Sequence, residues 1–388
     1  MVNEAADTRP SGPGDLAGLR RLVIKLGSSS LTRDDGGLDL NRLDIVAAEV
    51  ARLASRGVEV VIVSSGAIAA GLAPLGLSER PRVIAQAQAA AALGQGLLLA
   101  HWRSAFQSHY RHVAQVLLTV SDVTRRSSYL NVRQALHELL EAGIIPIVNE
   151  NDTVATDEIR FGDNDRLAAM VAQAVHADLL VLLTDVDALY TAPPSNPSAS
   201  RITRVDDIAA LPQVEIGGAG SRVGTGGMET KLAAARIAVA CGIPVHLAAA
   251  DELHRVLTSG TCGTWFTPSP VRRPSRLAWV AHAAGVAGRV TIDRGALRAL
   301  RRHGSSLLAA GVTAIDGAFR AGEVVGLWCD GAEVGRGIVA FDSEVASSIV
   351  GLRMSQMSSH VDTPRPLVHR DDLVLFRDGR DPDTTVGA

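Results

Sequence analysis

The stretch Arg21–Leu31 reads RLVIKLGSSSL, an apolar run that breaks into a glycine and three serines directly after a lysine. The branched apolar residues favour a buried strand, and the glycine and serines favour a turn at which backbone N–H groups can approach an anion. Similar apolar runs recur along the chain, separated by long alanine-rich segments with helical periodicity. This alternation predicts an α/β domain with a mostly parallel sheet sandwiched by helices.

Lysine is rare in this chain and is confined to two glycine-rich loops. Lys25 and Lys231 are the only two lysines among 38 lysine and arginine residues. Lys25 precedes GSSS, and Lys231 closes the loop GTGGMETK at 224–231. Lysine carries a compact, mobile ammonium group, whereas arginine carries a planar guanidinium fork. We interpret the two lysines as marks of sites that need a small movable cation.

Four predicted strands finish in small, hydroxyl, amide or acidic residues. They are VIKLGSSS, VIVSSGA, PIVNEND and LLLTDVD. Each ending alone is ordinary turn chemistry. Because ligands bind beyond the carboxyl ends of parallel strands, the four endings together with GTGGMETK predict a cleft for phosphate and a polar substrate. The chain has no Walker A motif and no GxGxxG, which argues against P-loop and dinucleotide-binding folds.

Composition and charge restrict the class of protein. A length of 388 residues suits one large domain and a smaller one. A formal net charge of -3 argues against a protein that binds polyanions overall. The three cysteines are far apart in the sequence, so we expect neither zinc nor disulfides, and a cytoplasmic location. We expect no signal peptide, because no charged, apolar and cleavage-site sequence opens the chain, and no membrane span, because no apolar run reaches about 20 residues.

The segment 149–166, NENDTVATDEIRFGDNDR, is densely polar and lies between two apolar elements. Taken alone, the segment is as compatible with a solvated acidic loop that ends in a helix cap at GDND as it is with a binding site. Asp163, Asn164 and Asp165 stand at the predicted helix start, where adjacent side chains point in different directions. A carboxylate there can hold two ammonium groups or bind Mg²⁺, and an asparagine can hold a substrate amine or carboxylate.

Six motifs between about residues 21 and 266 carry a resemblance to a known family. They are VIKLGSSSL, VIVSSGAIAAGL, IIPIVNENDTV, FGDNDRLAA, LLLTDVDALYT and GTGGMETKLAAA. In this order and spacing the chain resembles the glutamate 5-kinases of the amino acid kinase family. The resemblance implies the amino acid kinase fold. It also implies ATP-dependent phosphorylation, with Mg²⁺, of the γ-carboxylate of L-glutamate to L-glutamyl 5-phosphate, the first step of proline biosynthesis.

Position by position, the resemblance also implies roles for individual residues. Those implied to act on the transferring phosphoryl group are Lys25 and Lys231, with Asp165 organising them and Asp163 assisting it. Those implied to bind glutamate are Ser65, Asp152 and Asn164. Those implied to form the nucleotide site are Lys25, Thr184, Asp185, Thr225, Gly226, Gly227, Met228, Glu229, Thr230 and Lys231. Glu229 departs from the expected motif, and no protein ligand of Mg²⁺ is assigned.

Further partners follow from the resemblance alone. It implies proline as a feedback inhibitor and a homo-oligomer, either a dimer or a tetramer. It also implies glutamyl-phosphate reductase as a functional partner.

The chemistry of the implied reaction agrees with the residues found. A carboxylate with a pKa of about 4.3 is already ionised at pH 7, so no general base is needed. The difficulty is that one anion must approach another, the γ-phosphate. Cations and aligned donors that neutralise the spreading charge would therefore supply the catalysis. Two lysines, backbone N–H groups and Mg²⁺ meet that need.

The sequence changes character after Phe266. TPSPVRRPSR at 267–276 predicts a linker, and glycine-punctuated apolar runs at 277–368 predict a small β-rich domain. That domain resembles the PUA domain, with RHGSSLLAAGV at 302–312 as its best marker. Ala309 stands where the resemblance leads us to expect proline. We therefore divide the chain into a disordered tail at 1–18, a kinase domain at 19–266, the linker, the PUA-like domain and a tail at 369–388.

Two alternative functions stay open. Another member of the kinase family could phosphorylate acetylglutamate, aspartate or a nucleoside monophosphate, and the glutamate-binding residues above would discriminate these acceptors. Alternatively, the chain could bind RNA through the PUA-like domain, using a basic helical face. The arginines of that face are Arg294, Arg298, Arg301 and Arg302. Acidic and basic residues are nearly balanced after residue 270, so a solvated face with a regulatory or assembly role is preferred.

Overall fold

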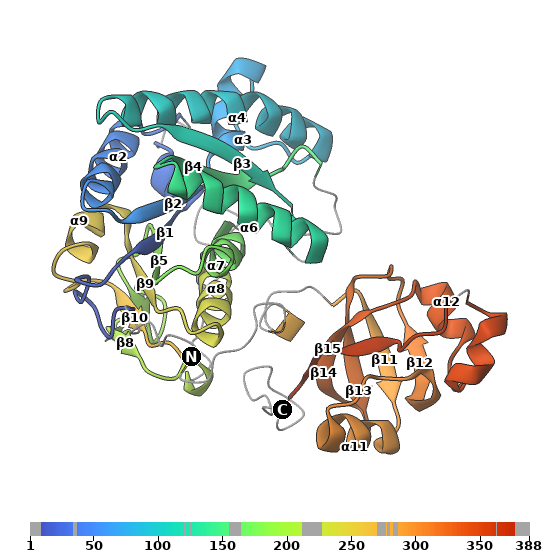
Figure 1. Ribbon diagram of the computed structural model, residues 1–388. Helices are drawn as coiled ribbons and strands as arrows, with labels where there is room; N and C mark the ends of the chain where they lie inside the picture. Colours follow the sequence, from blue (N-terminus) through green and yellow to red (C-terminus); the bar gives the residue numbers. More distant parts are fainter. Residues whose placement is uncertain are drawn as a thin grey trace. The chain divides into compact units, whose positions relative to one another are not determined.

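The chain divides into two compact units, residues 1–272 and 273–388. The boundary between them falls within the segment 267–276 that the sequence predicts as a linker. The computed structural model describes residues 9–33, 37–119, 122–123, 126–154, 164–211, 227–269, 277, 280–281, 286–361 and 363–376. Figure 1 labels the elements of both units.

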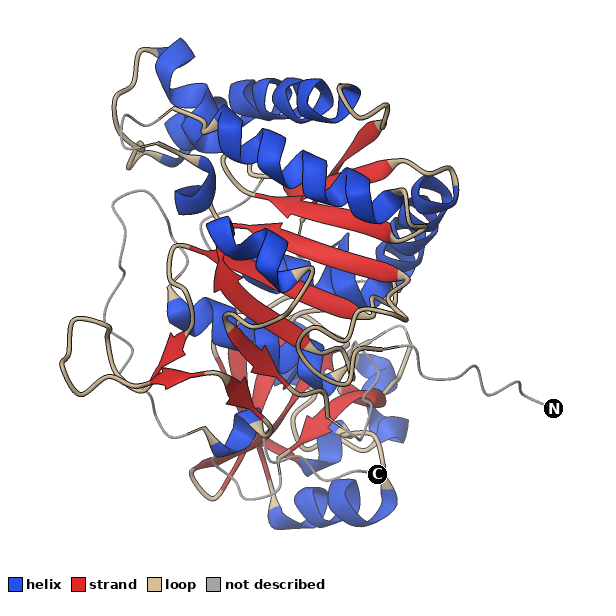
Figure 2. Cartoon of the chain, turned by 90° about the vertical axis from the view of Figure 1, so that its left-hand side faces the viewer, coloured by secondary structure: helices blue, strands red, loops and turns tan. Residues whose placement is uncertain are grey.

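The first unit contains an eight-stranded sheet in the order β3-β4-β2-β1-β5-β9-β10-β8, with helices on both of its faces (Figures 1 and 2). Its strands are β1 (Arg21–Leu26), β2 (Glu59–Ser64), β3 (Val113–Leu118), β4 (Ile145–Glu150), β5 (Leu179–Thr184), β8 (Arg204–Val205), β9 (Val245–Ala249) and β10 (Thr264–Phe266). Neighbouring strands from β3 through β9 are parallel, and β10 is antiparallel to β9. The expectation of a mostly parallel sheet between helices is confirmed.

The helices of this unit form two layers. They are α1 (Ser28–Leu31), α2 (Leu40–Ala54), α3 (Ala67–Leu72), α4 (Ile84–Gln107), α6 (Arg126–Glu141), α7 (Asn164–Ala174), α8 (Met228–Ala240) and α9 (Leu253–Val256). Short 3-10 turns occur at η1 (Ala73–Leu75), η3 (Ile208–Ala210) and η4 (Ala250–Glu252), and β6 (Leu189–Tyr190) pairs with β7 (Arg201–Ile202). No helix in the described part of the chain is both long enough and apolar enough to cross a membrane.

Strand β1 distributes its side chains between the two helix layers. Leu22, Ile24 and Leu26 join a buried cluster with residues of α2, α4 and α9. Because side chains alternate along a strand, Val23 and Lys25 point to the other face, where α7 packs against β1 and α8 packs against α7. The lysine of the opening stretch is thereby directed toward the start of α7.

Residues 9–18 are not the disordered tail that the sequence predicts. The Arg9 guanidinium donates to the carbonyl of Gly242, and Leu16 packs against the main core. Gly14 has φ +82°, and a Cβ there would lie 2.4 Å from the Ser259 carbonyl oxygen. Polar and glycine-rich composition therefore reflects a close backbone approach here. Residues 1–8 lie outside the described part of the chain.

The second unit is a five-stranded sheet in the order β12-β11-β13-β14-β15. Its elements are β11 (Gly288–Ile292), α11 (Arg294–His303), η5 (Ala309–Gly311), β12 (Val312–Asp316), β13 (Val324–Cys329), β14 (Ala332–Val339), α12 (Ser343–Ser348), η6 (Met354–Ser359) and β15 (Val368–Leu375). It has its own buried cluster, which includes Val290, Leu327 and Phe341. The predicted small β-rich domain is therefore present.

Two details of this unit bear on the sequence analysis. The predicted tail from residue 369 is wrong up to residue 376, because β15 pairs with β14 and Phe376 is buried. The consecutive polar residues His369, Arg370 and Asp371 are exposed within this strand, and residues 377–388 lie outside the described part. Ala309, where proline is expected, is buried, and its carbonyl accepts a hydrogen bond from the Gly351 N–H. The turn η5 therefore forms without proline.

Candidate active site

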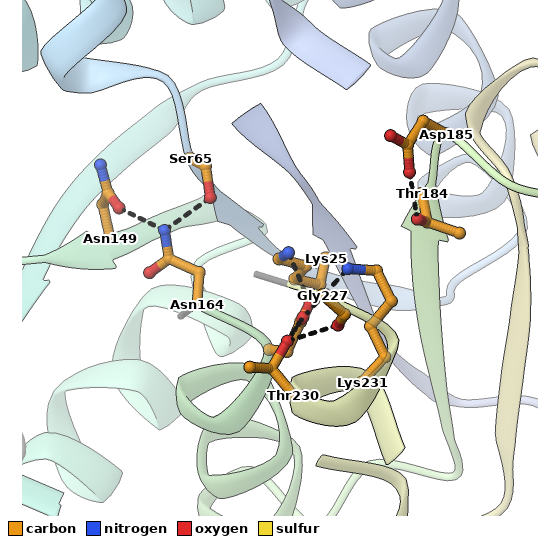
Figure 3. A network of polar contacts seen from close by, with 10 residues as sticks. Lys25, Ser65, Asn149, Asn164, Thr184, Asp185, Gly227, Thr230 and Lys231 are labelled. Carbon is orange, nitrogen blue, oxygen red and sulfur yellow. Dashed lines mark hydrogen bonds and ion pairs between the residues drawn. The ribbon is translucent and has the colours of Figure 1, made fainter. Parts of the chain in front are cut away.

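The carboxyl ends of adjacent parallel strands bring the polar endings of the sequence together. In the sheet register, Lys25 of β1 lies between Val63 of β2 and Leu182 of β5. Ser65 follows the last residue of β2, and Thr184 ends β5. Figure 3 shows these strand ends and the start of α7 around one space. The polar residues expected at the strand ends therefore share one edge of the sheet, formed by β1, β2, β4 and β5.

Two lysines meet one carboxylate at this edge. The ammonium nitrogen of Lys25 lies 2.5 Å from Asp165 Oδ1, and that of Lys231 lies 3.3 Å from Asp165 Oδ2. The side chains of Lys25, Lys231 and Asp165 are only 5%, 7% and 0% exposed. We call these three residues and Thr230 the lysine cluster. Among the described residues, the lysine cluster contains two cations and one anion, and this excess of positive charge favours the approach of an anionic ligand.

The starts of two helices set the geometry of the lysine cluster. Helix α7 begins at Asn164, which places Asp165 in its first turn. Helix α8 begins after its N-cap Gly227, and the Thr230 hydroxyl lies 2.7 Å from the Gly227 carbonyl and 2.9 Å from Asp165 Oδ2. Lys231 is the next residue. Helix α8 therefore brings its lysine to the carboxylate on α7. Figure 3 labels Gly227, Thr230 and Lys231 at the start of α8.

Beside the lysine cluster lies a set of uncharged side chains that are hydrogen-bonded to one another. Asn164 Nδ2 donates to Ser65 Oγ at 2.8 Å and to Asn149 Oδ1 at 2.9 Å. Asn149 Nδ2 donates to Gln95 Oε1 at 3.3 Å, and Gln115 Nε2 donates to the same oxygen at 3.1 Å. We call these five residues the amide network. It connects the end of β2, the end of β4, the middle of α4 and the start of α7.

Asp152 lies in the turn after β4 and is partly buried. Burial raises the pKa of its carboxyl to about 6, although the positive charge of Arg80 acts to lower it. Within the described part of the chain, no hydrogen bond joins Asp152 to the amide network.

The nucleotide residues expected from the sequence are partly described. The Thr184 hydroxyl is buried and donates to Asp185 Oδ1 at 2.9 Å. Met228 opens α8, and the exposed Glu229 lies in its first turn, where a carboxylate interacts favourably with the helix dipole. Asp163, Thr225 and Gly226 lie outside the described residues.

Asn149, Gln95 and Gln115 belong to the site in the structure but are not predicted from the sequence. Gln95 carried a usable signal, because it lies on the buried stripe of α4 between Ala91 and Leu98. A glutamine on the apolar face of an alanine-rich helix must find hydrogen-bond partners. Asn149 ends the strand motif IIPIVNEND, yet nothing in the sequence shows that its amide meets one from α4.

The donor set is compatible with magnesium that arrives with a nucleotide. Among the described residues, no group of three or more His, Cys, Asp or Glu is placed to hold a metal ion. Mg²⁺ in phosphoryl-transfer sites keeps several waters and binds one or two carboxylates together with substrate phosphates. Asp185 supplies a carboxylate at this edge that is not engaged by a lysine in the described part of the chain, so the residues fit such an ion.

Comparison with known proteins places the chain in a family. Residues 20–249 match the model of the amino acid kinase family, and residues 288–361 match that of the PUA domain. The chain belongs to the amino acid kinase family and carries a PUA domain in its second unit. Membership of this family makes it a kinase. The fold class and the C-terminal domain expected from the sequence are confirmed.

Several of the similar proteins are named glutamate 5-kinase. A protein named glutamate 5-kinase from Salinispora arenicola is 53% identical over 361 residues, which cover 92% of this chain and 98% of that protein. Another glutamate 5-kinase, from Cutibacterium acnes, is 50% identical over 367 residues, which cover 94% of each chain. Among solved structures, carbamate kinase from Giardia lamblia bound to AMP-PNP aligns with a TM-score of 0.48 at 17% identity, covering 64% of this chain and 99% of that one.

Proposed function

We propose that the chain transfers the γ-phosphoryl group of ATP to the γ-carboxylate of L-glutamate and forms L-glutamyl 5-phosphate. In the reaction a carboxylate oxygen forms a bond to the γ-phosphorus, and the bond from that phosphorus to the bridging oxygen of ADP breaks. The observation that carries the proposal is the meeting of Lys25 and Lys231 at Asp165. The glutamate 5-kinases that share about half of its residues supply the choice of substrate.

The lysine cluster suits the charge problem of this reaction. The attacking carboxylate is ionised at pH 7, so it needs no base. The two ammonium groups would contact the transferring phosphoryl group and neutralise the charge that spreads over its oxygens. Asp165 would hold both ammonium groups in place between transfers, with Asp163 assisting it. Lysine is suited to this because its ammonium group is small and can follow the moving phosphoryl group.

We assign glutamate to the neighbouring side of the same edge. Asp152 presents a carboxylate that can pair with the α-ammonium group of an amino acid. Ser65 and Asn164 present a hydroxyl and an amide, which carry no charge of their own. A zwitterionic amino acid head needs both kinds of group, whereas a nucleoside monophosphate needs neither an ammonium acceptor nor this arrangement.

We assign ATP to the other side, at the ends of β5 and the start of α8. The residues concerned are Lys25, Thr184, Asp185, Thr225, Gly226, Gly227, Met228, Glu229, Thr230 and Lys231. Helix N-termini favour phosphate because their N–H groups are unpaired. Bound Mg²⁺ would neutralise phosphate charge, and Asp185 is the carboxylate that fits it.

A coupled assay of ADP release across acceptors tests the proposal. We expect ATP consumption to depend on L-glutamate and Mg²⁺. The matched acceptors are acetylglutamate, L-aspartate and UMP, and each should give a rate at least about 100-fold lower, as expected when buried polar groups lose their partners. A preference for any of these three would replace glutamate as the substrate while leaving the kinase assignment intact.

The remaining partners are also part of the proposal. We infer a cytoplasmic homo-oligomer, a dimer or tetramer, that proline inhibits and that works with glutamyl-phosphate reductase in proline biosynthesis. We assign a regulatory or assembly role to the second unit. Removal of the residues after Thr267 should alter inhibition by proline or the oligomeric state more than the rate. Complete loss of activity in a well-folded truncation would contradict that role.

RNA binding by the second unit receives little support from α11. Two of the four arginines on its basic face are engaged within the chain: Arg294 pairs with Asp330, and Arg301 donates to the Phe376 carbonyl. Arg298 and Arg302 are exposed. Salt-dependent RNA binding without ATP turnover would favour that alternative.

A further inference from the structure

The backbone of Glu150 fixes the orientation of two side-chain amides in the amide network, those of Gln95 and Asn149. Gln95 Nε2 donates to the carbonyl oxygen of Glu150 at 3.2 Å, and the Glu150 N–H donates to Asn149 Oδ1 at 2.9 Å. A backbone carbonyl can only accept and a backbone N–H can only donate. Gln95 must therefore turn its oxygen toward Asn149, and Asn149 must turn its nitrogen toward Gln95. Their contact at 3.3 Å is consistent with both constraints.

This polarity passes on to Asn164. Because Asn149 Oδ1 is an acceptor, Asn164 must present its nitrogen to it, and the same nitrogen donates to Ser65 Oγ. The oxygen of Asn164 is then left over. It is buried and has no hydrogen-bond partner among the described residues. An unpaired buried acceptor of this kind is costly unless a ligand donates to it.

The leftover groups define the ligand that fits. Asn164 Oδ1 accepts and cannot donate, so it suits an ammonium group and disfavours a carboxylate. Ser65 Oγ already accepts from Asn164 and keeps its own hydrogen to donate, so it suits a carboxylate oxygen. The acceptor, Asn164 Oδ1, and the donor, the Ser65 hydroxyl, are linked through the Asn164 amide nitrogen. Together they match the ammonium and carboxylate groups of an α-amino acid.

We propose that Gln95 is a positioning residue that selects for amino acids by holding Asn164 Oδ1 toward the substrate ammonium group. Gln95 lies on the buried stripe of α4 and acts through Asn149. Removing its carboxamide leaves Asn149 Nδ2 buried without its acceptor, so Asn149 turns or moves and no longer fixes Asn164. The inference rests on the proposed function for the identity of the acceptor.

The test compares L-glutamate with glutarate, which lacks only the amino group. In the unmodified full-length chain, kcat/KM for glutamate should exceed that for glutarate. In Gln95→Met this ratio should fall by about tenfold, the effect of one hydrogen bond to a charged group. The KM for ATP should change by less than about twofold. If Gln95 were needed only for folding, its substitution would lower kcat/KM for both acceptors by the same factor.

Two further variants keep the test decisive. Gln95→Glu keeps the shape but places an oxygen against the Glu150 carbonyl, so the ratio should fall there too if Gln95→Met does not fold. Gln173→Met is the matched control, because Gln173 is a partly buried amide on α7 that accepts from the Tyr129 hydroxyl outside the network. Its glutamate-to-glutarate ratio should stay unchanged.

The outcomes separate this inference from the proposed function. An unchanged ratio in both Gln95 variants, or an equal loss with both acceptors, would overturn the positioning role. If the unmodified chain prefers a different amino acid, the proposed substrate fails, and the comparison is repeated with that amino acid and its deaminated counterpart. A preferred acceptor without an ammonium group would overturn both.

Discussion

The lysine cluster and the amide network begin at adjacent residues of one helix and differ in charge. Asp165 forms ion pairs with two lysines, whereas Asn164 donates hydrogen bonds to the Ser65 hydroxyl and to the first of several neutral amides. Consecutive residues at a helix start point in different directions, so one turn of α7 serves two places. In the reaction we propose, the carboxylate organises cations on the phosphoryl side, and the amide organises hydrogen bonds on the acceptor side.

This difference has energetic consequences. Removal of one member from a buried charged group leaves an uncompensated charge, whereas removal of one member from a neutral network leaves one or two unsatisfied hydrogen bonds. We therefore expect the lysine cluster to control turnover and stability together. The amide network should instead control the choice of acceptor.

The largest effect is expected from Asp165→Asn. The substitution leaves two buried ammonium groups without a counter-charge, and we expect kcat to fall by about 1000-fold and the free energy of unfolding by about 3 kcal/mol. Initial rates and denaturant unfolding measure the two effects. Asp178→Asn is the control, since Asp178 Oδ2 accepts from the Arg20 and Arg21 N–H groups, and an amide oxygen can replace it. Activity within tenfold of normal in Asp165→Asn would remove the lysine cluster from the mechanism.

Lys25→Arg and Lys231→Arg should each lower kcat by about 100-fold, because a planar guanidinium cannot follow the phosphoryl group as an ammonium can. Charge is retained, so we expect the unfolding midpoint to change little. Arg56→Lys, the reverse exchange at an exposed position, is the control. Near-normal turnover in either lysine variant would show that the compact ammonium group is not required.

Gly94→Ala probes the backbone that carries Ser65. A Cβ at Gly94 would lie 1.8 Å from the carbonyl oxygen of Ala67, the first residue of α3, so α3 must move. We expect a loss of about 2 kcal/mol in the free energy of unfolding and a higher KM for glutamate. Gly96→Ala, two residues away with nothing within 4 Å, should instead stabilise by about 0.5 kcal/mol. Equal midpoints for the two variants would contradict the close packing of α3 on α4.

The smallest effect concerns the pH dependence of glutamate use. Burial raises the pKa of Asp152 to about 6, so its carboxylate is mostly ionised at pH 7 and mostly protonated at pH 5. If the ionised form binds the substrate ammonium group, kcat/KM for glutamate falls by about tenfold between pH 7 and pH 5. Asp152→Asn should be slower at pH 7 but should lose this dependence. A pH profile that is the same in Asp152→Asn would assign the titration to another group.

The sequence predicted the fold and the charged half of the site for physical reasons. Alternating apolar runs and helical periods specify a parallel sheet, and strand ends in such a sheet share one edge. The rarity of lysine marked Lys25 and Lys231, and the GDND motif marked the residue that joins them. Each of these signals lies within a short segment, so it can be recognised from the sequence alone.

The neutral half of the site could not be predicted in the same way. The contact between Gln95 and Asn149 joins residues 54 positions apart, and its polarity depends on the backbone of Glu150. Residues 9–18 also mislead, because a polar, glycine-rich composition describes both a mobile tail and a segment laid closely against Ser259. Composition records which groups are present, whereas packing decides which of them meet.

Trapping the product with hydroxylamine tests the central claim most directly. An acyl phosphate reacts with hydroxylamine to give a hydroxamate, whereas a phosphate ester does not. With Mg²⁺, ATP and L-glutamate, the account predicts glutamyl hydroxamate in a one-to-one ratio with ADP, and its loss in Asp165→Asn. ADP release without glutamate-dependent hydroxamate would contradict the account.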